Sequence, residues 1–186
     1  MKNNNYWYCS IDIEANGPIP GKFSMLSLGA AGFTPEGKML STFSVNLKVL
    51  PGAIESPETM SWWATNQAAY DATRLNTVDP KLAMEQFVSW VNKQPGKPVA
   101  VCYPATFDFM FIYYYMINFD LISPFSFSAL DIKSYASAML KLPYRESTKR
   151  NMPKHWFSNN PHTHIAEEDA IEQGQLFINM LKENNK

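Results

Sequence analysis

Strand-like runs at the start of this 186-residue chain constrain its fold more than any other feature. Residues 6–13 are aromatic and β-branched, and the run stops at the loop composition of residues 15–18. Residues 24–33 and 39–49 flank the sequence Thr34-Pro-Glu-Gly37, which favours a hairpin turn. These runs predict an antiparallel meander of strands.

The rest of the chain alternates predicted helices with a short apolar strand. Ser56-Pro57-Glu58 combines an N-cap hydroxyl, a proline suited to the first helical position and an early acid, so we predict a helix through Ala69. Asp79-Pro80 repeats this pattern and opens an amphipathic helix. Further along the chain, apolar spacing predicts a strand buried on both faces at residues 98–103, and helices at 107–119, 131–140 and 166–181.

A meander followed by strands that alternate with helices predicts an α/β fold, with a mixed sheet and helices packed on it. With 46% hydrophobic residues, the chain is long enough for one packed domain over residues 1–186, and we expect no second domain. A formal net charge of -1 excludes strong bulk attraction to nucleic acid. Any nucleic-acid binding therefore has to be local.

Two further features bear on the compartment. Every apolar run stops well short of about 18 residues, and the polar start of the chain does not resemble a signal peptide, so we expect no membrane span. Cys9 and Cys102 each lie in an apolar, strand-like run, which predicts buried thiols and argues against a disulfide or a thiolate metal site. We therefore expect a cytoplasmic protein.

Carboxylates near two predicted strands could converge on one site. Asp12 and Glu14 are two residues apart on a predicted strand, so their side chains point to the same face and could bind one cation. A solvated strand edge can carry the same pair. Asp108 lies between two phenylalanines after a buried strand, where a carboxylate is costly unless it is paired or binds a metal. Alternatively, Asp108 caps the helix that follows.

His164 and Asp169 lie five positions apart at the entry to the last predicted helix. The aspartate can face inward from the first turn, while the histidine lies on the preceding loop. A histidine near an aspartate is also common on protein surfaces. Taken alone, this pair does not indicate a function.

In order and register, these fragments resemble the DEDDh branch of the DEDD exonucleases, over residues 11–177. The resemblance implies a ribonuclease H-like fold, with an antiparallel meander followed by parallel strands and helices on both faces. It also implies a 3′-to-5′ exonuclease with catalytic, metal-binding acids Asp12, Glu14, Asp108 and Asp169, and with His164 as the general base. The tyrosine branch would place a tyrosine where this chain has Ile165. His162 is a rival base, but its distance from Asp169 does not fit the motif.

The same resemblance implies a two-metal-ion mechanism. Asp12 would bridge the two cations, Glu14 and Asp169 would support the one that activates water, and Asp108 would support the one at the leaving group. Oxygen ligands suit Mg²⁺ or Mn²⁺. A neutral His164 imidazole would then take the proton from the attacking water.

Three further segments narrow the resemblance to one family: residues 103–109, 123–136 and 147–154. They are similar to the bacterial exoribonuclease family that includes RNase AS, which is related more distantly to RNase T and oligoribonuclease. This implies trimming of single-stranded RNA from its 3′ end with release of nucleoside 5′-monophosphates, a preference for adenylate in some members, and usually a homodimer. A proofreading-type exonuclease acting on single-stranded DNA is an alternative, as is a catalytically silent nucleic-acid-binding domain.

Substrate-binding residues also follow from the resemblance. The loop after the acid pair, Ala15, Asn16 and Gly17, would contact the terminal nucleotide. Trp63 would stack on its base, as an aromatic residue does in oligoribonuclease. Trp62 is the alternative, because one of two adjacent helical tryptophans normally faces the core.

Basic residues are concentrated in one part of the chain. Residues 131–160 carry a net charge of +4 from lysine, arginine, aspartate and glutamate. We predict that this segment, including Lys149 and Arg150, tracks the phosphates of the substrate. A solvated loop without a ligand is the alternative reading. Asp131 could be a fifth site acid, although a helix cap is its simpler role.

Overall fold

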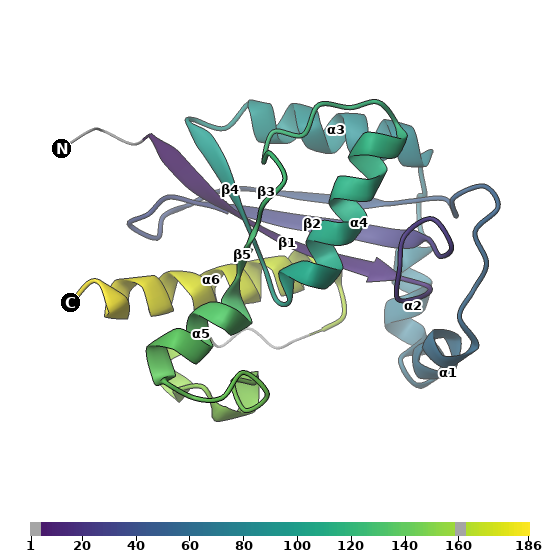
Figure 1. Ribbon diagram of the computed structural model, residues 1–186. Coiled ribbons are helices and arrows are strands. Elements are labelled where there is room, and N and C mark those ends of the chain that lie inside the picture. The colour runs from purple at the N-terminus through teal and green to yellow at the C-terminus, as the bar shows by residue number, and fades with distance from the viewer. Residues whose placement is uncertain (1–4, 159–162) are drawn as a thin grey trace.

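A five-stranded mixed sheet forms the centre of the protein (Figure 1). The computed structural model describes residues 5–158 and 163–186. The strands are β1 (Tyr6–Ala15), β2 (Met25–Phe33), β3 (Met39–Asn46), β4 (Lys97–Cys102) and β5 (Leu130–Asp131), in the spatial order β3-β2-β1-β4-β5. β1, β2 and β3 pair antiparallel, whereas β4 runs parallel to β1 and to β5. This arrangement confirms the predicted meander and mixed sheet.

Helices cover both faces of the sheet (Figure 1). On one face lie α3 (Pro80–Asn92) and α4 (Ala105–Asn118), in a core rich in aromatic side chains. On the other face lie α5 (Ile132–Leu140) and α6 (Ala166–Asn184). Two short helices, α1 (Pro57–Thr65) and α2 (Gln67–Thr73), lie near the end of β1. The predicted α/β fold, with helices on both faces of a mixed sheet, is therefore confirmed.

Local signals set the starts of α1 and α3. The Ser56 side chain accepts a hydrogen bond from a backbone N–H in the first turn of α1, and Asp79 does the same for α3. The single helix predicted to run from Ser56 through Ala69 is instead two helices. The break falls at Asn66, where the backbone leaves the helical region while its N–H still bonds to the carbonyl of Trp63.

Gly29 lets the last helix approach the sheet closely. Gly29 lies opposite Asp12 in the register of β1 and β2. A Cβ at this position would lie 2.1 Å from the backbone carbonyl of Ala166. Nearby, the side-chain amide of Gln173 donates to the carbonyl oxygen of Ile11 at 2.6 Å. The first turns of α6 are therefore held directly against the strand that carries the acid pair.

The structure confirms the prediction of buried thiols. Cys9 and Cys102 are free and buried, as predicted, and burial raises the pKa of both thiols well above its ordinary value. Within the described parts of the chain, the helices are all too short or too polar to cross a membrane.

Candidate active site

The predicted acids and the predicted base meet at one pocket. Asp12 and Glu14 line a pocket of about 190 Å³ at the end of β1. Asp108 from α4, Asp169 from α6 and His164 from the loop before α6 line the same pocket. Folding therefore brings together five residues from three distant parts of the sequence.

Asp108 is fixed to the central strand. It is 3% exposed, lies in the first turn of α4, and accepts a hydrogen bond from the backbone N–H of Ile13 at 3.1 Å. The alternative reading, in which Asp108 caps this helix, is wrong, because α4 begins at Ala105 and Pro104 occupies the cap position.

Asp169 orders the loop that carries His164. Its two carboxylate oxygens accept hydrogen bonds from the backbone N–H groups of Thr163 and His164, each at 2.9 Å. The loop places His164 in a left-handed backbone conformation, with φ of 58°, which is uncommon for a residue other than glycine. One donor atom each from Glu14, His164 and Asp169 lie within 4.8 Å of one another. These three donors could hold a divalent cation.

The acids disfavour one another's ionisation. Burial raises the pKa of Asp12 well above its ordinary value, and the charges of Asp108, Glu14 and Asp169 add to this. Burial and the charges of Asp169 and Asp108 raise the pKa of Glu14 to about 9. Burial also raises the pKa of Asp108 to about 7, although backbone hydrogen bonds oppose the shift. A bound divalent cation would reverse this balance, because it favours the charged carboxylates.

The two adjacent tryptophans of α1 divide between core and surface. Trp63 is 1% exposed, and its indole N–H donates to the carbonyl oxygen of Ala15 at 3.0 Å. Trp62 is 41% exposed, and its ring lies edge-on to the His164 imidazole, with 4.9 Å between centroids. The predicted choice of Trp63 as the base-stacking residue does not fit this packing, because Trp63 fills the core and Trp62 lies at the site.

The loop after β1 is too buried for the contact with a terminal nucleotide that the sequence predicts. Ala15 and Asn16 are 6% and 0% exposed, and the Asn16 side-chain oxygen accepts a backbone hydrogen bond from within the same loop. A Cβ on Gly17 would lie 2.2 Å from the ring of Phe23. Direct side-chain contact between these three residues and a nucleotide does not fit this packing. Ile19, further along the loop, is 47% exposed.

The basic segment contributes Lys149 to the edge of the site. The backbone N–H of Lys149 donates to the phenol oxygen of Tyr103 at 3.1 Å, and Tyr103 lines the acid pocket. The Lys149 ammonium forms an ion pair with Glu172 on α6. Arg150, next in the sequence, is exposed. Sequence reasoning missed Tyr103 and Glu172, although a glutamate on the apolar side of the last helix needs a partner, and this was a usable signal.

Asp131 and His162 are the remaining site candidates from the sequence. Asp131 caps α5, since its side chain accepts from the backbone N–H of Ser134 at 2.7 Å, and it also accepts from the N–H of Ala105 at 2.9 Å. The simpler role for Asp131 is therefore confirmed. His162, the rival base, lies outside the described residues.

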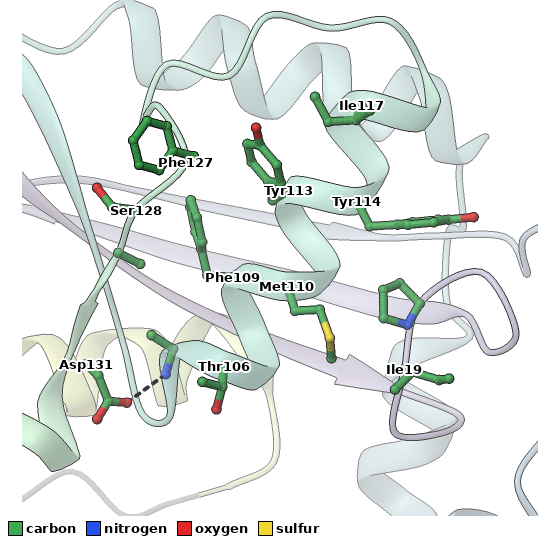
Figure 2. A pocket seen from close by; sticks show the side chains of 13 residues that line it. Ile19, Thr106, Phe109, Met110, Tyr113, Tyr114, Ile117, Phe127, Ser128 and Asp131 are labelled. Atoms are coloured by element: carbon green, nitrogen blue, oxygen red, sulfur yellow. Dashed lines mark hydrogen bonds between the residues drawn. The ribbon is translucent and has the colours of Figure 1, made fainter.

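A second pocket, of about 870 Å³, lies along the outer side of α4. Figure 2 shows Phe109 and Tyr113 of this helix on one side and Phe127 on the other. Asp131 is the carboxylate among its lining residues, and it is already engaged by the N–H of Ala105. Because this pocket offers no cluster of metal donors, we take the acid pocket as the candidate active site.

Three solved structures illustrate the likeness of this fold to known proteins. The nuclease domain of 3′hExo, described as a DEDDh family member bound to rAMP, has a TM-score of 0.72 and 13% identity over 98% of this chain and 95% of that chain. S. pombe Pop2p in its Mg²⁺- and Mn²⁺-bound form has a TM-score of 0.69 and 13% identity, over 92% of this chain and 81% of that one. The zinc-bound E. coli ExoI–ssDNA complex has a TM-score of 0.67 and 14% identity, over 100% of this chain and 41% of that one.

The acid pocket, the likeness to these structures and the sequence comparisons together define the class of protein. It is a DEDDh-type 3′-5′ exonuclease, a hydrolase of phosphodiester bonds. Residues 8–181 match the family described as the 3′-5′ exoribonuclease Rv2179c-like domain, and the chain belongs to this family. It is also 31% identical over 193 residues to the "3′-5′ DNA exonuclease Cap18" of Escherichia coli, covering 100% of this chain and 98% of that protein.

Proposed function

We propose that this protein is a two-metal-ion exoribonuclease that removes nucleoside 5′-monophosphates from the 3′ end of single-stranded RNA. The observation that carries the proposal is the meeting of Asp12, Glu14, Asp108, Asp169 and His164 at one pocket. The family description, which names an exoribonuclease, supports RNA as the substrate.

The four carboxylates would hold two divalent cations, Mg²⁺ or Mn²⁺. When bound, such cations supply Lewis-acid activation of the phosphodiester and of the attacking water. The raised pKa values of Asp12, Glu14 and Asp108 support this assignment, because buried acids that repel one another are stabilised by positive charge.

His164 would act as the general base. Its imidazole lies among the acids, and Asp169 holds its backbone in place. A neutral imidazole can take the proton from the attacking water within hydrogen-bond reach. The exposed face of Trp62, beside His164, would stack on the terminal base, a contact worth about 1 to 3 kcal/mol.

Single-stranded DNA is the second candidate substrate. A specific observation favours it, since the *E. coli* relative that matches the whole chain is named a DNA exonuclease. End-labelled RNA and DNA of the same sequence, incubated in parallel with Mg²⁺ or Mn²⁺, separate the two candidates. We expect a ladder that shortens from the 3′ end of RNA; a ladder on DNA alone would assign the second substrate.

The Asp12→Ala variant is the matched control for this assay. It removes one site acid and should fold normally while losing turnover. If the wild-type protein trims neither polymer but binds one of them, the protein is a silent nucleic-acid-binding domain and the proposed function is wrong.

We also propose a homodimer. The apolar pocket along α4 supports it, because Ile117 and Phe127 beside this pocket are 57% and 80% exposed, and contiguous exposed apolar surface is typical of protein interfaces. Light scattering should give twice the mass of the chain, and a Phe127→Glu variant should give the monomer mass. A monomeric wild-type protein would contradict this proposal.

A further inference from the structure

Lys149 is held at the edge of the acid pocket by two side chains to which the proposed function gives no role. Its ammonium forms an ion pair with Glu172 and lies 5.5 Å from the centre of the Tyr103 ring. Its backbone N–H donates to the phenol oxygen of Tyr103 at 3.1 Å. Both the backbone and the side chain of Lys149 are therefore fixed.

Both partners of Lys149 belong to the elements that build the site. Glu172 follows Asp169 by three residues on α6, and its side chain is 6% exposed. Tyr103 lines the acid pocket and lies just before α4, which carries Asp108. The position of Lys149 is therefore coupled to the positions of the metal-binding acids.

The side chain of Lys149 keeps part of its surface open to solvent. It is 29% exposed although its ammonium is paired with Glu172. The ammonium also lies beside the ring of Tyr103, which lines the acid pocket. A lysine that served only to neutralise Glu172 would not need this exposure at the edge of the pocket.

We propose that Lys149 contacts the non-bridging oxygens of the scissile phosphate and that Glu172 and Tyr103 are positioning residues that hold it there. This inference rests on the proposed function. In the reaction, the bond from phosphorus to the 3′ oxygen breaks and a bond from phosphorus to the oxygen of water forms. The water proton goes to His164, and the leaving 3′ oxygen takes a proton from solvent. Lys149 exchanges no proton, and its fixed charge stabilises the negative charge on the phosphate in the transition state.

Steady-state kinetics with the preferred polymer test the role of Lys149. Lys149→Gln should lower kcat about 100-fold, the size expected for the loss of one preorganised charge contact, and should change KM by less than about 3-fold. Lys149→Arg, which keeps the charge, should recover part of the loss. Lys93→Gln, an exposed lysine at the end of α3, is the matched control and should leave kcat unchanged.

A double variant tests whether the partners act through Lys149. Glu172→Gln and Tyr103→Phe should each lower kcat about 10-fold. The double variant Lys149→Gln and Glu172→Gln should be no slower than Lys149→Gln alone, because Glu172 has no other route to the substrate. The affinity for Mn²⁺, measured by calorimetric titration, should stay within about 3-fold of wild type in all these variants, which a merely structural role would not give.

The outcomes separate this inference from the proposed function. Trimming that depends on Asp12 but is unchanged in Lys149→Gln would overturn the role of Lys149 alone. Losses that multiply in the double variant, or a parallel loss of Mn²⁺ affinity, would overturn the positioning role of Glu172. A wild-type protein that trims neither RNA nor DNA would overturn both proposals.

Discussion

The β1 strand lies between β2 and β4, and Asp12 and Glu14 are held by antiparallel pairing with Gly29 and Ser27 of β2. His164 and Trp62 are held differently: one lies on a loop fixed by Asp169, and the other lies on a helix of nine residues. The strand-borne half of the site, Asp12 and Glu14, follows from regular backbone pairing. The loop-borne half, His164 with Trp62 beside it, depends on single side-chain contacts. Substitutions should therefore affect the two halves in different ways.

The largest effect is expected in the strand-borne half. Asp12→Ala should lower kcat more than about 10,000-fold, because the cations would lose a shared ligand and with it several kcal/mol of charge stabilisation. Its melting temperature without metal should be equal to or above that of wild type, since one of several mutually repelling acids is gone. End-labelled substrate and scanning calorimetry measure the two quantities. A clear loss of stability without metal would contradict this account of the acid pocket.

A smaller effect is expected in the loop-borne half. His164→Ala should lower kcat about 100- to 10,000-fold through loss of the general base. The backbone contact to Asp169 remains in this variant, so the fold should be retained. Activity as a function of pH provides the check: the variant should lose the rise in rate that accompanies deprotonation of an imidazole. A variant with wild-type kcat would remove His164 from the mechanism.

The tryptophan pair sharpens the comparison within one helix. Trp63→Ala should lower the free energy of unfolding by about 3 to 5 kcal/mol, because a buried side chain and its hydrogen bond to Ala15 are lost. Trp62→Ala should change stability by less than about 0.5 kcal/mol and weaken substrate binding about 5- to 150-fold. Urea unfolding and KM measurements distinguish the two. The reverse pattern would restore the sequence-based choice of Trp63.

The smallest expected effect concerns metal and pH. Folding raises the pKa of Glu14 from 4.5 to about 9 and that of Asp108 from 3.8 to about 7. The stability from these groups is therefore fully present below about pH 4 and is lost as pH rises through 7 to 9. In EDTA, the melting temperature should fall over this range. Divalent cation at about 100 times its Kd should restore about 5 to 10 °C at pH 8. A melting temperature in EDTA that stays level from pH 5 to 9 would contradict the raised pKa values.

Regular patterns in the sequence were enough for the strand-borne half. The aromatic and β-branched composition of residues 6–13 predicted the strand, and the spacing of Asp12 and Glu14 predicted their shared face, because the side-chain period of a strand is fixed. The place of Asp169 in the first turn of the last helix was predicted from the helical spacing of the apolar residues that follow it. The roles of the acids came from the family resemblance, and the pocket brings these acids together.

Contacts between distant segments explain what the sequence could not predict. The choice between Trp62 and Trp63 depends on which indole meets the carbonyl of Ala15, a contact across 48 positions. The burial of Asn16 depends on its bonds across the loop to Ser24. The two-residue strand β5 is too short to leave a periodic signal.

The close approach at Gly29 makes the activity of the site sensitive to a substitution outside it. A methyl group there would meet the backbone of α6 at 2.1 Å, and the first turn of that helix carries Asp169. Gly29→Ala would therefore push α6 away from the sheet. This would move the carboxylate of Asp169 away from the other acids without changing any site residue. A natural variant with all five motif residues intact could be silent for this reason alone.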